Sequence, residues 1–337
     1  LTRLSEISFN AVTLGDLSPL SELPKLHKLN LRETTLTNPS SLAALSTMRT
    51  LRLSQTDLSD MTALDALSQL DTVTVESGRL GDLSPLSELP NLRTLSLREV
   101  ALDKPESLAT LTQLWRLDWV GTGVTDVSPL TELTELQQLS LGGNDTVSDV
   151  SAVSKLTKLR DLSLGGNSAL TDISALSGLT NLTKLNLAMT PIDDLGPLAQ
   201  LTQLESIALP KDTVKDLSPL SGLSSLHHLD LADMTVTDLT PLSGMHNLES
   251  LDLSESAVVD ISPVGNLHNL RSLDLQETAV TDLSGLTSLV NLENVNASKT
   301  TIADIGPLAH LISLQKLNIS QTQVSDLSPL KGNIALR

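Results

Sequence analysis

Arginine and tryptophan are the first residues of this chain whose types and spacing point to chemistry. Most of the arginines recur at exposed positions of a repeated segment, and one tryptophan stands among them. Large planar or cationic side chains of this kind are enriched in protein-binding hot spots. The alternative is a solvated strand face that Glu33, Asp71, Glu76 and Glu99 neutralise. The candidate partner-binding residues are Arg49, Arg52, Arg93, Arg98, Trp115 and Arg116.

Aspartates form a second candidate set further along the chain. Asp230, Asp252 and Asp274 occupy the same position in three consecutive repeats, and neighbouring paired strands would align their like charges. Such a row would attract a basic partner segment. It could also hold a divalent cation through carboxylate oxygens, or serve only as a solubilising surface. All three interpretations stay open, and we include the row among the partner-binding candidates.

No catalytic constellation accompanies these residues. The sequence contains no GxSxG, HExxH or P-loop motif and no dinucleotide-binding glycine motif after a strand. His246 and His268 stand at corresponding places in adjacent repeats, where a solvated loop is a simpler interpretation than a metal site. We therefore expect no enzyme activity, no cofactor and no metal.

The elements that position these residues are copies of one 22-residue segment. Fifteen copies cover residues 4–335; thirteen have 22 residues, and the seventh and eighth have 23. A fixed period of 20 to 29 residues with regular leucines is typical of a solenoid. Copies are numbered here from the residue that opens each: 4, 26, 48, 70, 92, 114, 136, 159, 182, 204, 226, 248, 270, 292 and 314.

Each copy predicts a strand followed by a short helical turn. Leucines at positions 4 and 6 alternate with polar residues at 3, 5 and 7, which is the period of a strand with one buried face. Position 9 is mostly Thr or Asn, whose side chains bond backbone groups of adjacent turns. Where Val12, Gly78, Val100 or Met234 replaces them, we expect a looser turn.

An aspartate at position 13 opens the far side of the coil. It precedes Leu-Ser-Pro-Leu or a close variant, which predicts a capped single turn of 3₁₀ helix, and we assign this column to structure. A calcium ladder would need further oxygen ligands at each turn. The thirteen residues are Asp16, Asp60, Asp82, Asp126, Asp149, Asp172, Asp194, Asp216, Asp238, Asp260, Asp282, Asp304 and Asp326.

Two further features affect how the surface is interpreted. Trp119 stands at the inward position 6, where other copies have leucine, so we predict that it belongs to the core. The pairs Gly142–Gly143 and Gly165–Gly166 end the strands of copies seven and eight. They either let a ligand backbone approach closely or fit the local bulge, and the second interpretation is favoured.

Composition narrows the class of protein. The net charge of −18 argues against general nucleic-acid binding, which needs a basic stripe. Cysteine is absent, which excludes disulfides and thiolate metal sites. We find no signal peptide and no run of 18 apolar residues, so membrane insertion by this segment is not expected. We expect a single domain over 1–337, a fragment lacking its caps and flanking domains.

The repeat Leu-x-x-Leu-x-Leu-x-x-Thr-x-Val-x-Asp-Leu-Ser-Pro-Leu resembles that of bacterial internalin-type proteins. It is also similar to the repeat of a eukaryotic protein phosphatase regulator. The resemblance implies a right-handed α/β solenoid of leucine-rich repeats, with a parallel sheet on the concave face and 3₁₀ turns on the convex face. Internalin-like proteins are surface or secreted binders, so it also implies that the concave face engages a host protein. Thr largely replaces that family's Asn at position 9.

We therefore interpret the chain as a monomeric, non-enzymatic scaffold that binds an unidentified partner protein through its concave face. A bacterial surface or secreted protein with a role in virulence is favoured over a cytoplasmic one. The first alternative is a ligand-sensing or regulatory domain of a larger cytosolic signalling or effector protein. The second is a structural spacer on a cell envelope.

Overall fold

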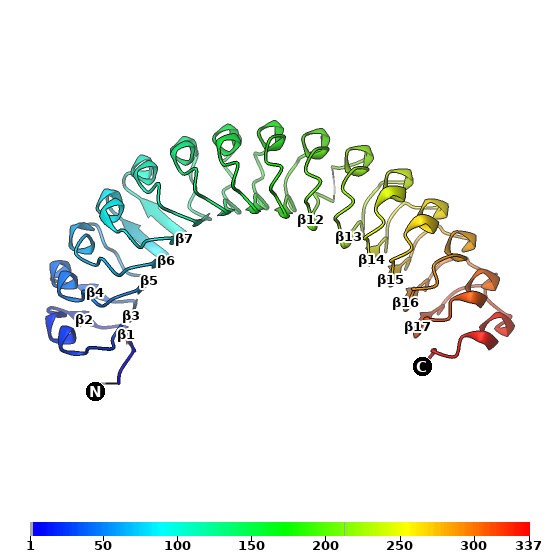
Figure 1. Ribbon diagram of the computed structural model, residues 1–337, viewed down its shortest axis with the longest axis horizontal. Helices are drawn as coiled ribbons and strands as arrows, with labels where there is room; N and C mark the ends of the chain where they lie inside the picture. The colour runs from blue at the N-terminus through cyan, green and yellow to red at the C-terminus, as the bar shows by residue number, and fades with distance from the viewer. Residues whose placement is uncertain (1–2, 212) are drawn as a thin grey trace. The chain divides into compact units, whose positions relative to one another are not determined.

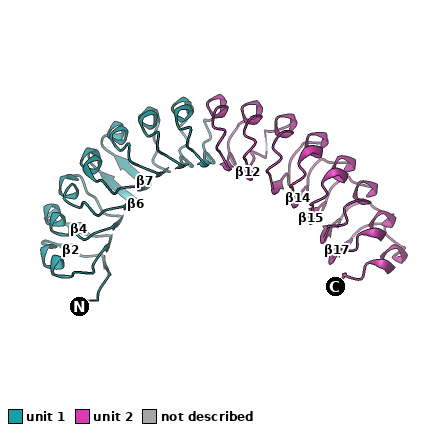
Figure 2. Cartoon of the chain, viewed as in Figure 1, with its two compact units in different colours: residues 1–169 teal, residues 170–337 magenta. Residues whose placement is uncertain are grey.

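The computed structural model describes residues 3–211 and 213–337 of the chain. Two compact units divide it, residues 1–169 and 170–337 (Figure 2). Within each unit, strands alternate with 3₁₀ helices, except that β1 and β3 are each followed by a second short strand, and the next coil stacks upon the last (Figure 1). The prediction of a single domain over 1–337 stays a prediction.

The strands of unit 1 are longest in its first six copies. They are β1 (Glu6–Asn10), β2 (Thr13–Leu14), β3 (Lys28–Arg32), β4 (Thr35–Leu36), β5 (Thr50–Ser54), β6 (Thr72–Leu80), β7 (Thr94–Leu102), β8 (Arg116–Val120), β9 (Gln138–Ser140) and β10 (Asp161–Ser163). Its 3₁₀ helices are η1 (Ser18–Glu22), η2 (Pro39–Ala44), η3 (Thr62–Leu64), η4 (Ser84–Glu88), η5 (Pro105–Thr110), η6 (Ser128–Glu132) and η7 (Ser151–Lys155).

Unit 2 has shorter, more uniform strands. They are β11 (Lys184–Asn186), β12 (Ser206–Ala208), β13 (His228–Asp230), β14 (Ser250–Asp252), β15 (Ser272–Asp274), β16 (Asn294–Asn296) and β17 (Lys316–Asn318). Its 3₁₀ helices are η8 (Ser174–Leu176), η9 (Gly196–Leu198), η10 (Ser218–Leu220), η11 (Thr240–Gly244), η12 (Ser262–Asn266), η13 (Ser284–Leu286), η14 (Gly306–His310) and η15 (Ser328–Gly332).

The predicted fold class is confirmed. Among the described residues, fifteen strands form a parallel sheet in sequence order, and β2 pairs with β4 beside it. In each unit the strands line the inner, concave side and the 3₁₀ helices line the outer side (Figure 1). Leucines at positions 4 and 6, such as Leu251 and Leu253, are buried between them. Trp119 is 1% exposed, which confirms its prediction as a core residue.

The turn at position 9 agrees with prediction only in part. Asn144 is fully buried, and its Oδ1 accepts the backbone N–H of Thr122 in the preceding copy at 2.8 Å. Thr278 instead donates to a carbonyl of its own copy, that of Leu275 at 2.8 Å. The looser turns predicted at Gly78 and Val100 are wrong, because β6 and β7 continue through these residues and pair there.

The aspartate column caps the helical turns as predicted. Each of the thirteen carboxylates accepts the backbone N–H of the residue two positions further on, at 2.7 to 3.0 Å. The aspartate stands one residue earlier than an ordinary N-cap. In η1, for example, Leu17 is the cap residue, while Asp16 bonds to Ser18 at the first helical position. Each short helix thus receives an acceptor for its first N–H.

These hydrogen bonds predict how the fold responds to acid. They lower the pKa of Asp149, mainly through the N–H of Ser151 and also through its hydroxyl. They also lower the pKa of Asp238, mainly through the hydroxyl of Thr240 and also through its N–H. A lowered folded-state pKa stabilises the fold above the unfolded value of about 4, and the contribution is lost as pH falls below it. We expect the melting temperature to stay level between about pH 7 and pH 5 and to fall below about pH 4.

Thermal unfolding followed by circular dichroism across this range would measure the effect. An Asp149→Asn variant keeps an acceptor but cannot titrate there, so its decline should be slightly shallower. A melting temperature that is the same at about pH 3 and pH 6 would contradict the assignment.

Candidate functional site

The six predicted basic and aromatic residues fall into two groups in unit 1. Arg93, Arg98, Trp115 and Arg116 lie on or next to β7 and β8. The backbone N–H groups of Trp115 and Arg116 both donate to the carbonyl of Arg93, at 2.9 Å, which fixes these residues side by side. Trp115 is 39% exposed, whereas most leucines around it are fully buried.

Asp118 lies within this group and was not predicted as a site residue. It occupies position 5 of β8 and is only 5% exposed, although position 5 faces the open side of the sheet. Its carboxylate accepts from Arg98 Nη2 at 3.2 Å, and from Arg116 Nη2 at 3.1 Å and Nε at 3.3 Å. A carboxylate two residues after Arg116, on a face rich in arginine, was the signal that could have identified it.

These bonds change the roles of the arginines. Arg116 also donates to Gln138 at 3.3 Å, so its fork is largely occupied. Arg98 is held by Asp118, and Arg93 donates one bond to the carbonyl of Leu92. Asp118 therefore orients two guanidinium groups and offsets one of their charges. We call Arg93, Arg98, Trp115, Arg116 and Asp118 the Trp115 cluster.

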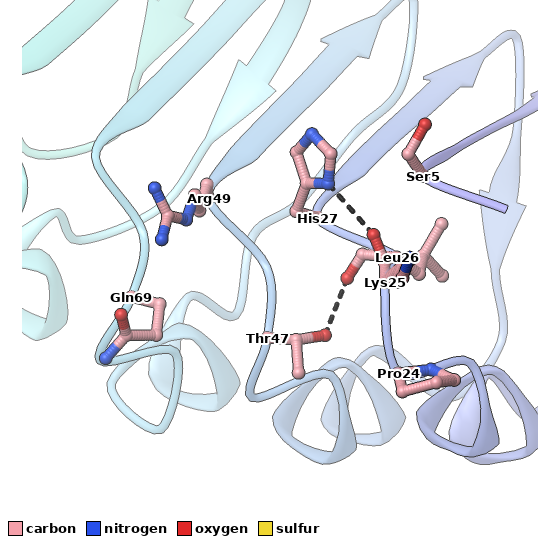
Figure 3. Close-up of a pocket in the computed structure, with 8 residues that line it drawn as sticks. All are labelled: Ser5, Pro24, Lys25, Leu26, His27, Thr47, Arg49 and Gln69. Carbon is pink, nitrogen blue, oxygen red and sulfur yellow. Dashed lines mark hydrogen bonds between the residues drawn. The ribbon is translucent and has the colours of Figure 1, made fainter. Parts of the chain in front are cut away.

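Arg49 and Arg52 lie apart from the Trp115 cluster, in copy three. Arg52 is exposed on β5 and contributes a minor part to the lowered pKa of Glu6, whose main cause is a hydrogen bond from Lys28. Arg49 lies beside His27 (Figure 3). Its backbone N–H donates to the His27 carbonyl at 2.8 Å. Arg49 and His27 line an open hollow of about 560 Å³, together with Ser5, Pro24, Lys25, Leu26, Thr47 and Gln69.

The predicted acidic row is aligned in unit 2. Asp230 pairs in register with Asp252 on β14, and Asp252 with Asp274 on β15. Each carboxylate accepts the N–H of the residue two positions later at 2.9 Å. Asn296 does the same at this position of copy fourteen. The row thus supplies hydrogen-bond acceptors to the backbone where each strand passes into its turn. The charge pattern alone did not indicate this structural role.

This role refines the expected effect of changing Asp252. Asp252→Asn keeps an acceptor for the Ser254 N–H and relieves repulsion from two neighbours, so stability should rise by a few tenths of a kcal/mol at low salt. Asp252→Ala removes the acceptor for both the N–H and the hydroxyl of Ser254 and should cost about 1 kcal/mol. Denaturant unfolding of both variants at two salt concentrations would measure this. Equal destabilisation by both would instead indicate that the negative charge itself is required.

The glycine pairs are explained by backbone geometry. Gly143 and Gly166 stand at position 8 with φ of +66° and +75°. Glu255 and Glu277 hold the same left-handed conformation at this position in their copies, with φ of +57°. A Cβ on Gly142 would lie 2.9 Å from the carbonyl oxygen of Gly165. The pairs therefore fit the turn and the close approach of neighbouring coils, as favoured from the sequence.

The described residues hold no candidate metal site and no candidate membrane span. Over residues 3–211 and 213–337, no three histidine or acidic side chains converge as they would around a metal ion. His246 and His268 are both exposed, and His246 Nδ1 lies 3.3 Å from the carbonyl of Asn266. In that same part of the chain, every helix is too short or too polar to traverse a lipid bilayer.

Stacked 22-residue coils with a leucine core, a concave parallel sheet and convex 3₁₀ turns define a leucine-rich-repeat protein. A family model of leucine-rich repeats, covering two copies at a time, matches residues 134–179, 157–201, 246–288 and 290–332. The chain therefore belongs to the leucine-rich-repeat family, and it is internalin-like.

Two solved structures show the likeness to internalins. An internalin from Listeria monocytogenes is 25% identical, with 99% of this chain and 86% of that one covered and a TM-score of 0.63. Internalin C2 from Listeria monocytogenes is 35% identical over 58% of this chain and 84% of that one, with a TM-score of 0.52.

A plant receptor shares the fold. The leucine-rich-repeat ectodomain of the membrane receptor kinase GASSHO1/SCHENGEN3 from Arabidopsis thaliana, in complex with Casparian strip integrity factor 2, is 22% identical and has a TM-score of 0.73. The match covers 96% of this chain and 42% of that one. No curated protein matches the chain.

Proposed function

We propose that this chain is a non-enzymatic scaffold that binds a partner protein through the Trp115 cluster on the strand face of unit 1. The observation that carries the proposal is Trp115 itself, which is 39% exposed beside Arg93 in a chain with two tryptophans. Arg116 follows it in sequence, and Arg98 lies further along the neighbouring strand β7. Asp118 holds both guanidinium groups in place, which lowers the entropy lost when a partner binds. Internalin-like repeats and a receptor ectodomain solved in complex with Casparian strip integrity factor 2 support a protein-binding class.

The partner of such a surface carries an apolar or aromatic side chain for Trp115 and an acidic group for Arg93. A bacterial surface or secreted role in binding a host protein follows from the resemblance to internalins. The alternative role, ligand sensing within a larger signalling protein, draws on the likeness to a receptor ectodomain. The flanking sequence of the gene would distinguish the two roles. A wall anchor would favour the surface role, and a kinase domain would favour the sensing role.

The binding test uses an Arg93→Ala/Trp115→Ala double variant, which spares the internal Arg116–Asp118 contact. Proteins captured from host-cell surface extracts by the intact chain would be identified, and their affinities measured by calorimetry. The double variant should weaken binding by at least about 2 kcal/mol, or roughly 30-fold. Arg32→Ala on the same face of β3 is the matched control and should bind as the intact chain does. An unchanged affinity of the double variant would refute the assignment.

The acidic row stays a second proposed surface, for a basic partner segment. Asp252→Asn would slow association with such a partner, since long-range charge acts mainly on the on-rate. An unaltered on-rate at low salt would leave Asp230, Asp252 and Asp274 with the structural role alone.

A further inference from the structure

A second parallel pairing lies beside the main sheet of unit 1, over repeat positions 9 to 12, in two separate pieces. In copies one and two it is the pair β2–β4. In copies three to five it comprises the bridge Leu58↔Leu80 and the extended pairing of β6 with β7, which reaches Leu80↔Leu102. Position 11 directs its backbone toward the next copy: Leu58 N–H donates to the Arg79 carbonyl at 3.0 Å, and the Leu58 carbonyl accepts from Gly81 at 3.2 Å.

This ladder stops at Leu102, the position-11 residue of copy five. The register of β7 with β8 ends at Arg98↔Val120, four residues earlier. Within the part of the chain that the structure describes, no backbone bond joins Leu102 to copy six, although Leu58 makes two such bonds to copy four. The N–H and C=O of Leu102 on that side thus form an open strand edge.

Copy six cannot extend the ladder because its backbone turns away. Gly123, at position 10, has a φ of +69°, outside the range of a strand. The positive φ of Gly121 at position 8 is not the cause, because Ser77 and Glu99 share it in copies that extend the ladder. The N–H groups of Thr122 and Gly123 instead donate to Asn144 Oδ1 in copy seven, at 2.8 and 3.2 Å. The outgoing segment of copy six is therefore bonded on the side away from Leu102.

A hollow of about 290 Å³ lies along the open edge. Val100, Ala101, Leu102 and Pro105 line one side, and Trp119 and residues 122–126 line the other. Leu102, Pro105 and Val124 are half-buried, so they offer apolar contact, while Ala101 and Asp126 are exposed at its rim. The hollow combines unpaired backbone groups, an apolar lining and one carboxylate.

We propose that this hollow, the Leu102 edge, binds a short extended segment of a partner protein as an added strand. The backbone of that segment exchanges hydrogen bonds with Leu102, an apolar side chain contacts Pro105 and Val124, and a Lys or Arg meets Asp126. Strand addition of this kind takes its affinity from main-chain bonds and its specificity from alternate side chains. A second copy of this chain does not fit, because the same edge is recessed beside residues 122–126 in both copies.

The test begins with a phage-displayed library of random heptapeptides selected on the intact chain. Parallel selections use Ala101→Lys, which fills the rim and repels cations, and Trp115→Ala, which alters only the surface proposed above. Peptides that alternate apolar residues and carry a basic residue should be recovered from the intact chain and from Trp115→Ala, and lost with Ala101→Lys. This pattern separates the Leu102 edge from the Trp115 cluster.

The recovered peptides then allow a backbone test. A synthetic peptide with alternate backbone nitrogens methylated cannot donate to the edge and should bind about tenfold or more weakly. Asp126→Asn keeps its capping acceptor and should weaken binding of the basic peptide. Asp149→Asn, at the same position of copy seven, should leave that binding unchanged. Bound peptide should slow hydrogen exchange of the Leu102 amide.

Three results would overturn the inference. They are a failure to recover any peptide, recovery that Ala101→Lys does not affect, and equal affinity of the methylated and unmethylated peptides. A loss of binding in Asp149→Asn as large as that in Asp126→Asn would overturn it as well, because Asp149 does not line the hollow.

Discussion

Replacing Trp119 with alanine should destabilise unit 1 by roughly 3–5 kcal/mol, the cost of removing a buried aromatic side chain. Its side chain is 1% exposed and stands in register with Leu97 of the preceding strand. Neighbouring coils are joined by the backbone ladder and cannot collapse fully into the space that the indole leaves. The denaturant midpoint, followed by circular dichroism, would show the loss.

Trp115→Ala is the matched control, since it removes the other tryptophan of the chain from an exposed position. Its stability should stay within about 0.5 kcal/mol of the unaltered chain. Fluorescence provides an independent check, because Trp119 should supply the emission from an apolar environment and Trp115 the solvent-exposed emission. A Trp119→Ala variant that unfolds at the same denaturant concentration as the unaltered chain would show that the ring is not part of the core.

Replacing Asn144 with alanine should cost about 3 kcal/mol or more, because several buried backbone groups would lose their partners together. Its amide donates to the carbonyls of Trp119 at 2.7 Å and Leu141 at 2.9 Å. Its oxygen accepts from the N–H groups of Thr122 and Gly123 in the copy before. Water cannot replace these bonds easily, since Asn144 is 0% exposed.

Thr278→Ala at the same repeat position is the comparison. Thr278 donates one bond, to a carbonyl of its own copy, so its loss should cost about 1 kcal/mol. Chemical denaturation of both variants, with hydrogen exchange at Thr122 and Gly123, would distinguish a bond network from a single bond. Equal destabilisation by the two changes would mean that the contacts of Asn144 to copy six add little.

The repeat allowed most of the fold to be predicted because each coil obeys the same local rules. Alternation at positions 4 and 6 predicted the strands, and the Asp-Leu-Ser-Pro-Leu segment predicted the 3₁₀ turns and their capping acceptors. The inward orientation of Trp119 followed from register alone. These features depend on period and local hydrogen bonding, which a sequence displays directly.

Features that depend on contacts between copies were not predicted. Asp118 is buried because arginines from two strands fold over it, and its residue type is the same as that of the exposed Asp230. The left-handed column at position 8 is filled by Glu255 and Glu277 as well as by glycine, so composition does not mark it. The second ladder arises where strand pairing continues past the turn at Gly78 and Val100.

The capping aspartates also bear on how such an array can lengthen. Neighbouring carboxylates of the column affect one another: Asp216 slightly opposes the lowering of the Asp238 pKa, and Asp260 does so for Asp282. Each duplicated copy that carries the aspartate adds one more charge, which serves its own turn as an acceptor. At physiological ionic strength the Debye length is about 8 Å. The carboxylates lie by the outer turns, so neighbouring ones are further apart than the roughly 5 Å between adjacent strands. Each new carboxylate therefore interacts with only its nearest one or two predecessors, and the electrostatic cost of another copy does not grow with the number already present.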